Sequence, residues 1–207
     1  MENTWLTWAK QLQGIASTGI AYSEDPYDTI RYEEIAAIAN EMLATLGSVP
    51  IHKIQNLVSD FAQGYATPKV DVRGAVIEGN AILLVREASD GLWTLPGGFA
   101  DIGVSPSENV VKEIWEEAGI RVSAQGLYGI RHKAKHDYAP DARDFYKLFF
   151  VCRQLDDEPP SPGLETTEVG FFPLAELPAL STGRVLEKDL VAAFEFAEDP
   201  RRLALFD

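Results

Sequence analysis

Residues 95–120 read LPGGFADIGVSPSENVVKEIWEEAGI and contain the strongest pattern in the chain. The second half predicts a helix over 105–118 that begins with a capping box, in which Ser105 is the N-cap and Glu108 stands three residues later. A proline at the first helical position fits this start, and Gly119 supplies the left-handed residue that commonly ends a helix. The pattern therefore predicts one short, well-capped helix after a glycine turn.

Three glutamates of this helix, Glu113, Glu116 and Glu117, stand at positions i, i+3 and i+4, so their carboxylates share one face. Like charges at this spacing repel by about 0.2–0.5 kcal/mol per pair, and a helix C-terminus disfavours negative charge. A divalent cation would reverse both effects, because carboxylate oxygens suit Mg²⁺ or Mn²⁺. The alternative is a solvated acidic face. The upstream Gly97–Gly98 turn favours the metal site, since glycine lets backbone approach a ligand closely.

The stretch resembles the Nudix box, in which a glycine, five residues, a glutamate and seven residues precede Arg-Glu-aliphatic-x-Glu-Glu-x-Gly-aliphatic. Gly98 takes the first position, and residues 112–120 take the last nine. Val104 stands where the family has glutamate and Lys112 where it has arginine, two residues that are expected to pair in the family. Glu108, four residues before Lys112, is a candidate replacement partner.

The resemblance extends over nearly the whole chain, through residues 65–76 (YATPKVDVRGAV), 145–152 (FYKLFFVC) and 165–181 (ETTEVGFFPLAELPALS). These segments resemble a Nudix subgroup that carries a helical N-terminal domain and is associated with ADP-ribose or CDP-choline-like compounds. The resemblance implies an α+β fold, namely a Nudix α/β/α sandwich with a mixed sheet after a small helical domain. We therefore expect a helical domain over 1–64 and a Nudix hydrolase domain over 65–207.

The resemblance also implies a metal-dependent pyrophosphohydrolase that cleaves the diphosphate of a nucleoside diphosphate linked to another moiety and releases a nucleoside monophosphate. Glu113, Glu116, Glu117 and a backbone carbonyl near Gly97 would hold Mg²⁺ or Mn²⁺. The expected partners are a small nucleotide substrate and a second copy of the chain, because relatives are commonly dimers. The alternatives are a house-cleaning hydrolase of nucleoside triphosphates and a non-catalytic nucleotide sensor; retention of the three glutamates favours an enzyme.

A general base is still needed, and Glu165 and Glu168 are the best candidates. The reason lies in the resemblance, since many relatives place a catalytic or metal-binding glutamate in a late loop. Either residue could instead be a loop carboxylate without a role, and Glu168 could cap the strand that follows it.

Two further groups are candidates for contacts with the substrate. Arg131, Lys133 and Lys135 would share one face if they lay on a strand, and this cationic strip would bind phosphates. The alternative is a solvated strand end. Trp93 and Phe99 flank the Gly97–Gly98 turn and could stack on a base or ribose, although aromatic residues in such positions are more often part of the core.

The segment before residue 65 has the apolar periodicity of helices. A second helix is expected after Asp25-Pro26, and a third near Ser48, with a proline in its first turn. The residues expected on the inner faces of the first two helices are Trp5, Trp8, Leu12, Ile15, Ile35, Ile38, Met42 and Leu46. Trp5 and Trp8 could instead form a subunit contact.

From Val70 onward the period changes to that of strands. Residues 70–86 predict a hairpin that turns at Glu78-Gly79-Asn80, and later strands are expected at 122–133, 145–154 and 168–172. A last helix is expected at 183–196. Strands with interspersed helices and no regular βαβ repeat are typical of an α+β sandwich.

Composition narrows the function further. The formal net charge is −14, and such a surface repels nucleic-acid phosphates, so DNA or RNA binding is not expected. Cys152 is the only cysteine, which excludes an intramolecular disulfide and is typical of a reducing cytoplasm. No signal peptide and no membrane-spanning segment is expected. We therefore expect a cytoplasmic protein that contacts neither nucleic acid nor membrane.

Overall fold

The computed structural model describes residues 3–47, 65–101 and 103–207. They fall into two compact units. The first holds the N-terminal residues through Pro68 together with Ala134–His136 and Pro140–Asp144, and the second holds the remainder from Lys69. The helix expected near Ser48 lies outside the described residues. None of the helices in this described part combines the length and apolar character needed to span a bilayer.

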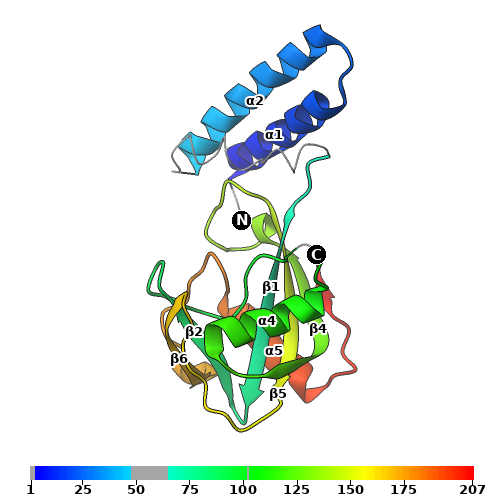
Figure 1. Cartoon of the computed structure of the whole chain (residues 1–207). Helices are drawn as coiled ribbons and strands as arrows, with labels where there is room; N and C mark the ends of the chain where they lie inside the picture. The colour runs from blue at the N-terminus through cyan, green and yellow to red at the C-terminus, as the bar shows by residue number, and fades with distance from the viewer. Residues whose placement is uncertain (1–2, 48–64, 102) are drawn as a thin grey trace. The chain divides into compact units, whose positions relative to one another are not determined.

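Two antiparallel helices, α1 (Thr4–Tyr22) and α2 (Pro26–Leu46), dominate the first unit (Figure 1). Asn3 and Asp25 cap them, each through a side-chain oxygen that accepts a hydrogen bond of 2.8 Å from the backbone amide two residues later. The expected start of the second helix after Asp25-Pro26 is therefore confirmed.

The residues that the two helices bury are small, apart from Leu6 and Leu43. Ala9, Ala16 and Ala39 are fully buried, and a Cβ added to Gly19 would lie 2.5 Å from the Tyr32 ring. Close approach of two backbones selects small residues at the contact. The expected inner faces are therefore wrong at their largest residues, which stay substantially exposed: Trp5, Trp8, Leu12, Ile15, Ile38 and Leu46.

The second unit is built on a mixed sheet with strand order β3-β2-β1-β5-β4-β7, and β6 pairs with β2. β1 pairs with β5, and β4 with β7, in parallel, whereas the other neighbours are antiparallel. The mixed sheet, including the hairpin of β1 and β2, confirms the expectation from the sequence. The strands are β1 Lys69–Glu78, β2 Ala81–Glu87, β3 Trp93–Thr94, β4 Val122–His132, β5 Phe145–Gln154, β6 Thr166–Pro173 and β7 Leu205–Phe206.

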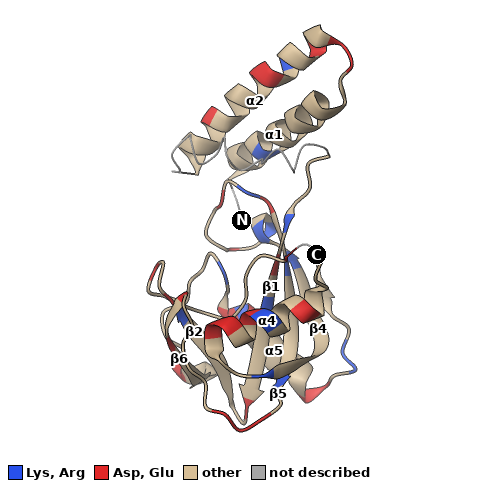
Figure 2. Ribbon diagram, in the orientation of Figure 1, with Lys and Arg blue, Asp and Glu red and all other residues tan. Residues whose placement is uncertain are grey.

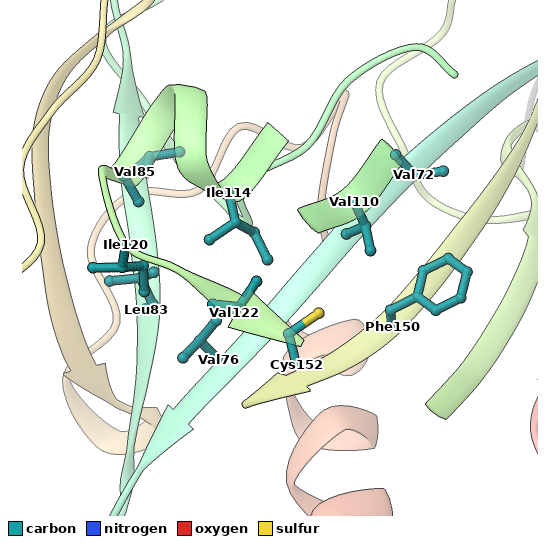
Figure 3. Packing of buried hydrophobic residues seen from close by; sticks show 11 residues of the cluster. Val72, Val76, Leu83, Val85, Val110, Ile114, Ile120, Val122, Phe150 and Cys152 are labelled. Carbon is teal, nitrogen blue, oxygen red and sulfur yellow. The ribbon is translucent and has the colours of Figure 1, made fainter. Parts of the chain in front are cut away.

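Two helices, α4 (Pro106–Ala118) and α5 (Glu187–Glu198), cover opposite faces of this sheet. Alternate residues of β1 serve the two faces, as the period of a strand requires. Val72 shares one core cluster with Val110 and Ile114 of α4, which Figure 3 shows from close by, while Ala75 belongs to the cluster under α5. The predicted α/β/α sandwich is therefore confirmed.

Some boundaries differ from the prediction, and β6 begins at Thr166 rather than at 168. The last helix begins at Glu187 rather than near 183, because the Asp189 carboxylate accepts the Leu186 amide at 2.9 Å and so fixes the helix start there. β4 ends at His132, and Lys133–Lys135 form a short 3-10 helix, η2.

Candidate active site

The site is built where β1 and β2 diverge. The two strands pair only beside their turn, and residues 96–100 run along the edge of β1 that β2 leaves open. Three backbone hydrogen bonds hold this segment, from Gly74 N to Pro96 O (2.9 Å), Val72 N to Gly98 O (2.8 Å) and Ala100 N to Val70 O (2.9 Å). The Gly97–Gly98 turn is therefore attached to the centre of the sheet.

Both glycines of this turn stand where a side chain would collide. Gly97 has φ of 145°, and a Cβ there would lie 2.0 Å from the Val72 carbonyl oxygen. A Cβ on Gly98 would lie 2.8 Å from Oε2 of Glu113. The turn thus fits closely between β1 and the acidic face of α4, as the glycine pair in the sequence indicated.

The start and end of α4 follow the predicted pattern. Ser105 Oγ accepts the Glu108 amide at 3.3 Å, and Glu108 Oε2 accepts the Ser105 amide at 2.9 Å, which completes the capping box. Gly119 ends the helix with φ of 68°. These caps fix the helix that carries the three glutamates.

Lys112 has other partners than the one considered from its spacing. Its Nζ lies 2.7 Å from Oδ2 of Asp101 and 3.4 Å from Oε2 of Glu116. The Glu108 carboxylate instead accepts a hydrogen bond from the Ser105 hydroxyl, so the expected ion pair between Glu108 and Lys112 is not found. Figure 2 shows acidic and basic residues side by side on α4.

Glu117 is the most enclosed of the three glutamates. It is 7% exposed, and its Oε2 accepts the Gly97 amide at 2.9 Å. Burial raises the pKa of Glu117 to about 7, although Arg73 and the Gly97 amide act in the opposite direction. Burial also raises the pKa of Glu113, which is half-buried beside Gly98. Both groups would gain from a cation that favours their charged forms.

The donors fit a hard divalent cation. Glu113 and Glu117 both lie against the Gly97–Gly98 turn, and carboxylate and carbonyl oxygens are the ligands that Mg²⁺ and Mn²⁺ prefer. Glu116 is exposed and directed to Lys112. Within the described ranges no three acidic, His or Cys side chains already converge as a metal cluster. A three-carboxylate set therefore requires Glu116 to leave Lys112.

Residues 161–166 attach the late loop to the end of α4. The Glu117 carbonyl accepts both the Thr166 hydroxyl at 2.8 Å and the Gly163 amide at 3.2 Å. The Ser161 amide donates to the carbonyl of Ala118 at 2.9 Å. The free carbonyls that every helix end leaves are thus satisfied by this loop, which also holds the backbone of Glu117.

Comparison with known proteins identifies the two parts of the chain. A sequence model of the NUDIX domain matches residues 68–194. A model described as a UDP-X-like, N-terminal oligomerisation domain matches residues 3–58. The chain belongs to the Nudix hydrolase family. The resemblance noted in the sequence, including the subgroup with a helical N-terminal domain, is confirmed.

Three relatives illustrate the match. A Bacillus subtilis (strain 168) protein named as a candidate ADP-ribose pyrophosphatase, YjhB, is 42% identical over 207 residues, which cover 100% of this chain and 99% of that protein. The crystal structure of an ADP-ribose pyrophosphatase from Streptococcus suis is 40% identical, covers 68% of this chain and 100% of its own, and has a TM-score of 0.62. That of a UDP-X diphosphatase is 28% identical, covers 98% of each chain and has a TM-score of 0.63. The expected enzyme class, a Nudix pyrophosphatase, is confirmed.

The two candidate bases of this Nudix domain lie in different settings. Glu168 on β6 is paired across the sheet, with Oε1 at 2.5 Å from Nη1 of Arg86. Glu165 is exposed in the loop before β6, and its carboxylate is one of the charges that raise the pKa of the buried Glu87, after burial itself. Glu165 directly precedes Thr166, whose hydroxyl donates to the Glu117 carbonyl at 2.8 Å, so the loop that carries Glu165 is attached to the helix of the Nudix box.

The basic residues expected to bind phosphates do not share a strand face. β4 ends one residue after Arg131, whose Nε lies 2.9 Å from Oδ1 of the buried Asp189. Lys133 is buried, with Nζ 5.0 Å from the centroid of the Phe145 ring. Lys135 is exposed and belongs to the first unit. The premise of a common strip is wrong, because the chain leaves the strand geometry at Lys133.

The two aromatic residues beside the turn make different contacts. Trp93 packs edge-on against Phe172, with ring centroids 4.7 Å apart, in the cluster under α5. Phe99 stacks on Phe145 with centroids 5.5 Å apart and remains 47% exposed. Trp93 is thus part of the core, whereas Phe99 also presents a surface beside the Nudix box.

Three charged residues near the site escaped the sequence analysis. Asp71 and Arg73 of β1 and Glu87 of β2 are each no more than 6% exposed. Nε and Nη2 of Arg73 donate to the Asp71 carboxylate at 2.8–3.3 Å, and Lys147 Nζ donates to it as well. The available signal was the charge at alternate positions of an otherwise apolar strand, VDVRGAV, because a strand buried on both faces carries charge only where it is paired.

The raised pKa of Glu117 predicts a pH dependence of stability in metal-free protein. The folded protein holds this proton up to about pH 7, whereas the unfolded chain releases it near the ordinary value of 4.5. This stabilisation is therefore complete below pH 4.5 and is lost as pH rises through 7. At about 1.4 kcal/mol per pKa unit, the shift from 4.5 to about 7 limits it to roughly 3–4 kcal/mol. Denaturant unfolding in EDTA should show this fall.

Glu117→Gln serves as the control for this pH dependence. The difference in free energy of unfolding between the wild type and this variant should change over this pH range. Added Mg²⁺ should restore the stability of the wild type at pH 7.5, because carboxylate ligands bind a metal in their deprotonated form. A difference that stays constant with pH would contradict the assignment of the slope to Glu117.

Proposed function

We propose that this chain is a metal-dependent pyrophosphohydrolase that cleaves the diphosphate of a nucleoside diphosphate linked to a second moiety. The carrying observation is the contact of Glu117 with the Gly97 amide, which sets a buried carboxylate and a close backbone turn side by side. The names of the relatives favour ADP-ribose or a UDP-linked moiety as the substrate. The resemblance seen in the sequence adds a CDP-choline-like compound. Cleavage would release a nucleoside monophosphate.

The proposed ligands are Glu113, Glu116, Glu117 and the backbone carbonyl at Gly97. Bound Mg²⁺ or Mn²⁺ supplies charge neutralisation of the diphosphate and a more acidic water. The chain supplies the geometry, because the capped helix α4 and the turn along β1 hold Glu113 and Glu117 in place before any ligand binds.

Glu165 is the proposed general base, which takes the proton of the attacking water. Its loop is attached to α4 by the hydrogen bond from the Thr166 hydroxyl to the Glu117 carbonyl. Glu168 is the less favoured candidate, because its carboxylate is held by Arg86.

A substrate panel tests the function directly. Purified full-length protein is incubated with ADP-ribose, CDP-choline, a UDP-sugar, FAD, NADH and nucleoside triphosphates, in Mg²⁺, in Mn²⁺ and in EDTA, and the products are resolved by chromatography. We expect cleavage of a diphosphate-linked compound to a nucleoside monophosphate only with metal. Preferred hydrolysis of a triphosphate would support the house-cleaning alternative, and nucleotide binding without any turnover would support a sensor; either result overturns the proposal.

We also propose that residues 1–64 form a homodimerisation module and that 65–207 form the catalytic domain. The match of 3–58 to an oligomerisation domain supports this division. The exposed outer side of α1 supplies the apolar surface, because Trp5 and Trp8 form an edge-to-face pair and remain 58% and 48% exposed. Large exposed aromatic patches commonly mark protein–protein contacts.

Trp8→Glu should convert the proposed dimer to a monomer, because a charge placed in an apolar interface is left without a partner. Light scattering after size exclusion measures the mass. Leu203→Glu is the control, since Leu203 is 87% exposed in the second unit and its substitution should leave the mass unchanged. A dimer that survives Trp8→Glu at micromolar concentration would exclude this face.

A further inference from the structure

We propose that Arg73 is a positioning residue that fixes the Gly97–Gly98 turn in the conformation that binds metal. This inference rests on the metal-dependent function proposed above. It assigns a role in the site to a strand residue outside the Nudix box, through its contact with the peptide just before the turn.

Arg73 connects the turn to a buried anchor. Its Nη1 donates to the Leu95 carbonyl at 3.1 Å, while Nε and Nη2 donate to the Asp71 carboxylate at 2.8–3.3 Å. The side chain is 5% exposed, so water does not compete for these donors. A planar guanidinium with five donors can make both sets of contacts at once, and a point charge cannot.

The peptide that Arg73 contacts, at Leu95, leads directly into the Gly97–Gly98 turn. Leu95 precedes Gly97 by two residues, and the Gly97 amide donates to Glu117 at 2.9 Å. A Leu95 carbonyl held in place by Arg73 therefore limits the positions that the Gly97 amide and carbonyl can take.

Asp71 has two buried cationic partners, Arg73 and Lys147, so the removal of one can be compared with the removal of the other. Asp71 accepts hydrogen bonds from both Arg73 and Lys147, and all three side chains are buried, so two positive charges meet one negative charge. Removal of either cation leaves a neutral pair with Asp71 rather than an unpaired buried charge. Of these two cations, Arg73 donates to the Leu95 carbonyl just before the turn, whereas the Lys147 ammonium lies 5.5 Å from the centroid of the Tyr138 ring.

The test therefore compares Arg73→Met with Lys147→Met in the full-length protein. Hydrogen exchange of metal-free protein measures the turn itself, and we expect about tenfold faster exchange in residues 95–100 for Arg73→Met, since a buried bond from a charged donor is lost. Calorimetric titration with Mn²⁺ alone measures the site, and we expect about 10- to 100-fold weaker binding for Arg73→Met, the usual effect of losing an outer-shell partner. Lys147→Met should match the wild type in both measurements.

The outcomes separate the two proposals. If Arg73→Met keeps the hydrogen exchange and the Mn²⁺ affinity of the wild type, the role of Arg73 is overturned. Equal losses in both variants would also overturn it, because they would assign the effect to the buried charges in general. Absence of saturable Mn²⁺ binding to the wild type would instead overturn the proposed function, while the exchange measurement would still decide whether Arg73 holds the turn.

Discussion

Glu117→Gln should lower turnover by at least about 10²-fold, the scale seen when one preorganised polar group of an active site is removed, while the fold persists. The amide has nearly the same shape, and its oxygen can still accept the Gly97 amide that now binds Oε2 at 2.9 Å. It loses the negative charge that a divalent cation requires. Because the carboxylate is buried and its pKa is raised, the variant should equal or exceed the wild type in metal-free stability at pH 7.5.

Glu108→Gln is the matched control on the same helix. Glu108 is exposed and serves the capping box with Ser105, a position where glutamine is also accepted. Both proteins are compared by steady-state kinetics on the substrate found in the panel and by circular dichroism. Turnover of Glu117→Gln within a few-fold of the wild type would remove Glu117 from the proposed metal site.

Gly97→Ala should destabilise the protein strongly, although it adds only one methyl group. The added Cβ would lie 2.0 Å from the Val72 carbonyl oxygen and 2.9 Å from the Arg73 Cα, both parts of the central strand β1. A φ of 145° is also essentially restricted to glycine. The backbone must move, so we expect a loss on the order of 3 kcal/mol in the free energy of unfolding, together with loss of metal binding.

Gly79→Ala separates collision from backbone strain. Gly79 also has positive φ, at 58°, but nothing lies within 4 Å of its added Cβ. We expect a loss of only about 1–2 kcal/mol for this variant, from the left-handed conformation alone. Urea unfolding compares the two variants. An equal loss in both would mean that the Gly97 segment can shift away from β1, and the turn would then not be held as described.

The sequence predicted those parts whose signals are local. The capping box, the left-handed glycine and the spacing of the glutamates each involve residues within one helix, and the structure contains the helix as expected. The hairpin and the central strands also followed from their alternation. The helical hairpin was harder, because its contact uses Ala9, Ala16 and Ala39, whose small size carries little weight in an apolar pattern.

The remaining features depend on partners distant in the chain. Asp71 is buried against two cations, Arg73 on its own strand and Lys147, which stands 76 residues after Asp71 in the chain. Arg131 is directed to Asp189 by the docking of α5, which no local pattern reveals. Periodicity can place such residues on a face of a strand, but it does not identify the charge that faces them across the sheet.

The attachment of the Gly97–Gly98 turn to β1 has a consequence for affinity. Residues 96–100 are hydrogen-bonded to the central strand like an additional strand, although they form a loop. Ordering a loop on binding costs about 1–2 kcal/mol of conformational entropy per residue. Here folding has already ordered the backbone of the turn, so an ion that binds there does not have to order these residues, although Glu116 must turn away from Lys112. Preorganisation of this kind strengthens binding without any added contact.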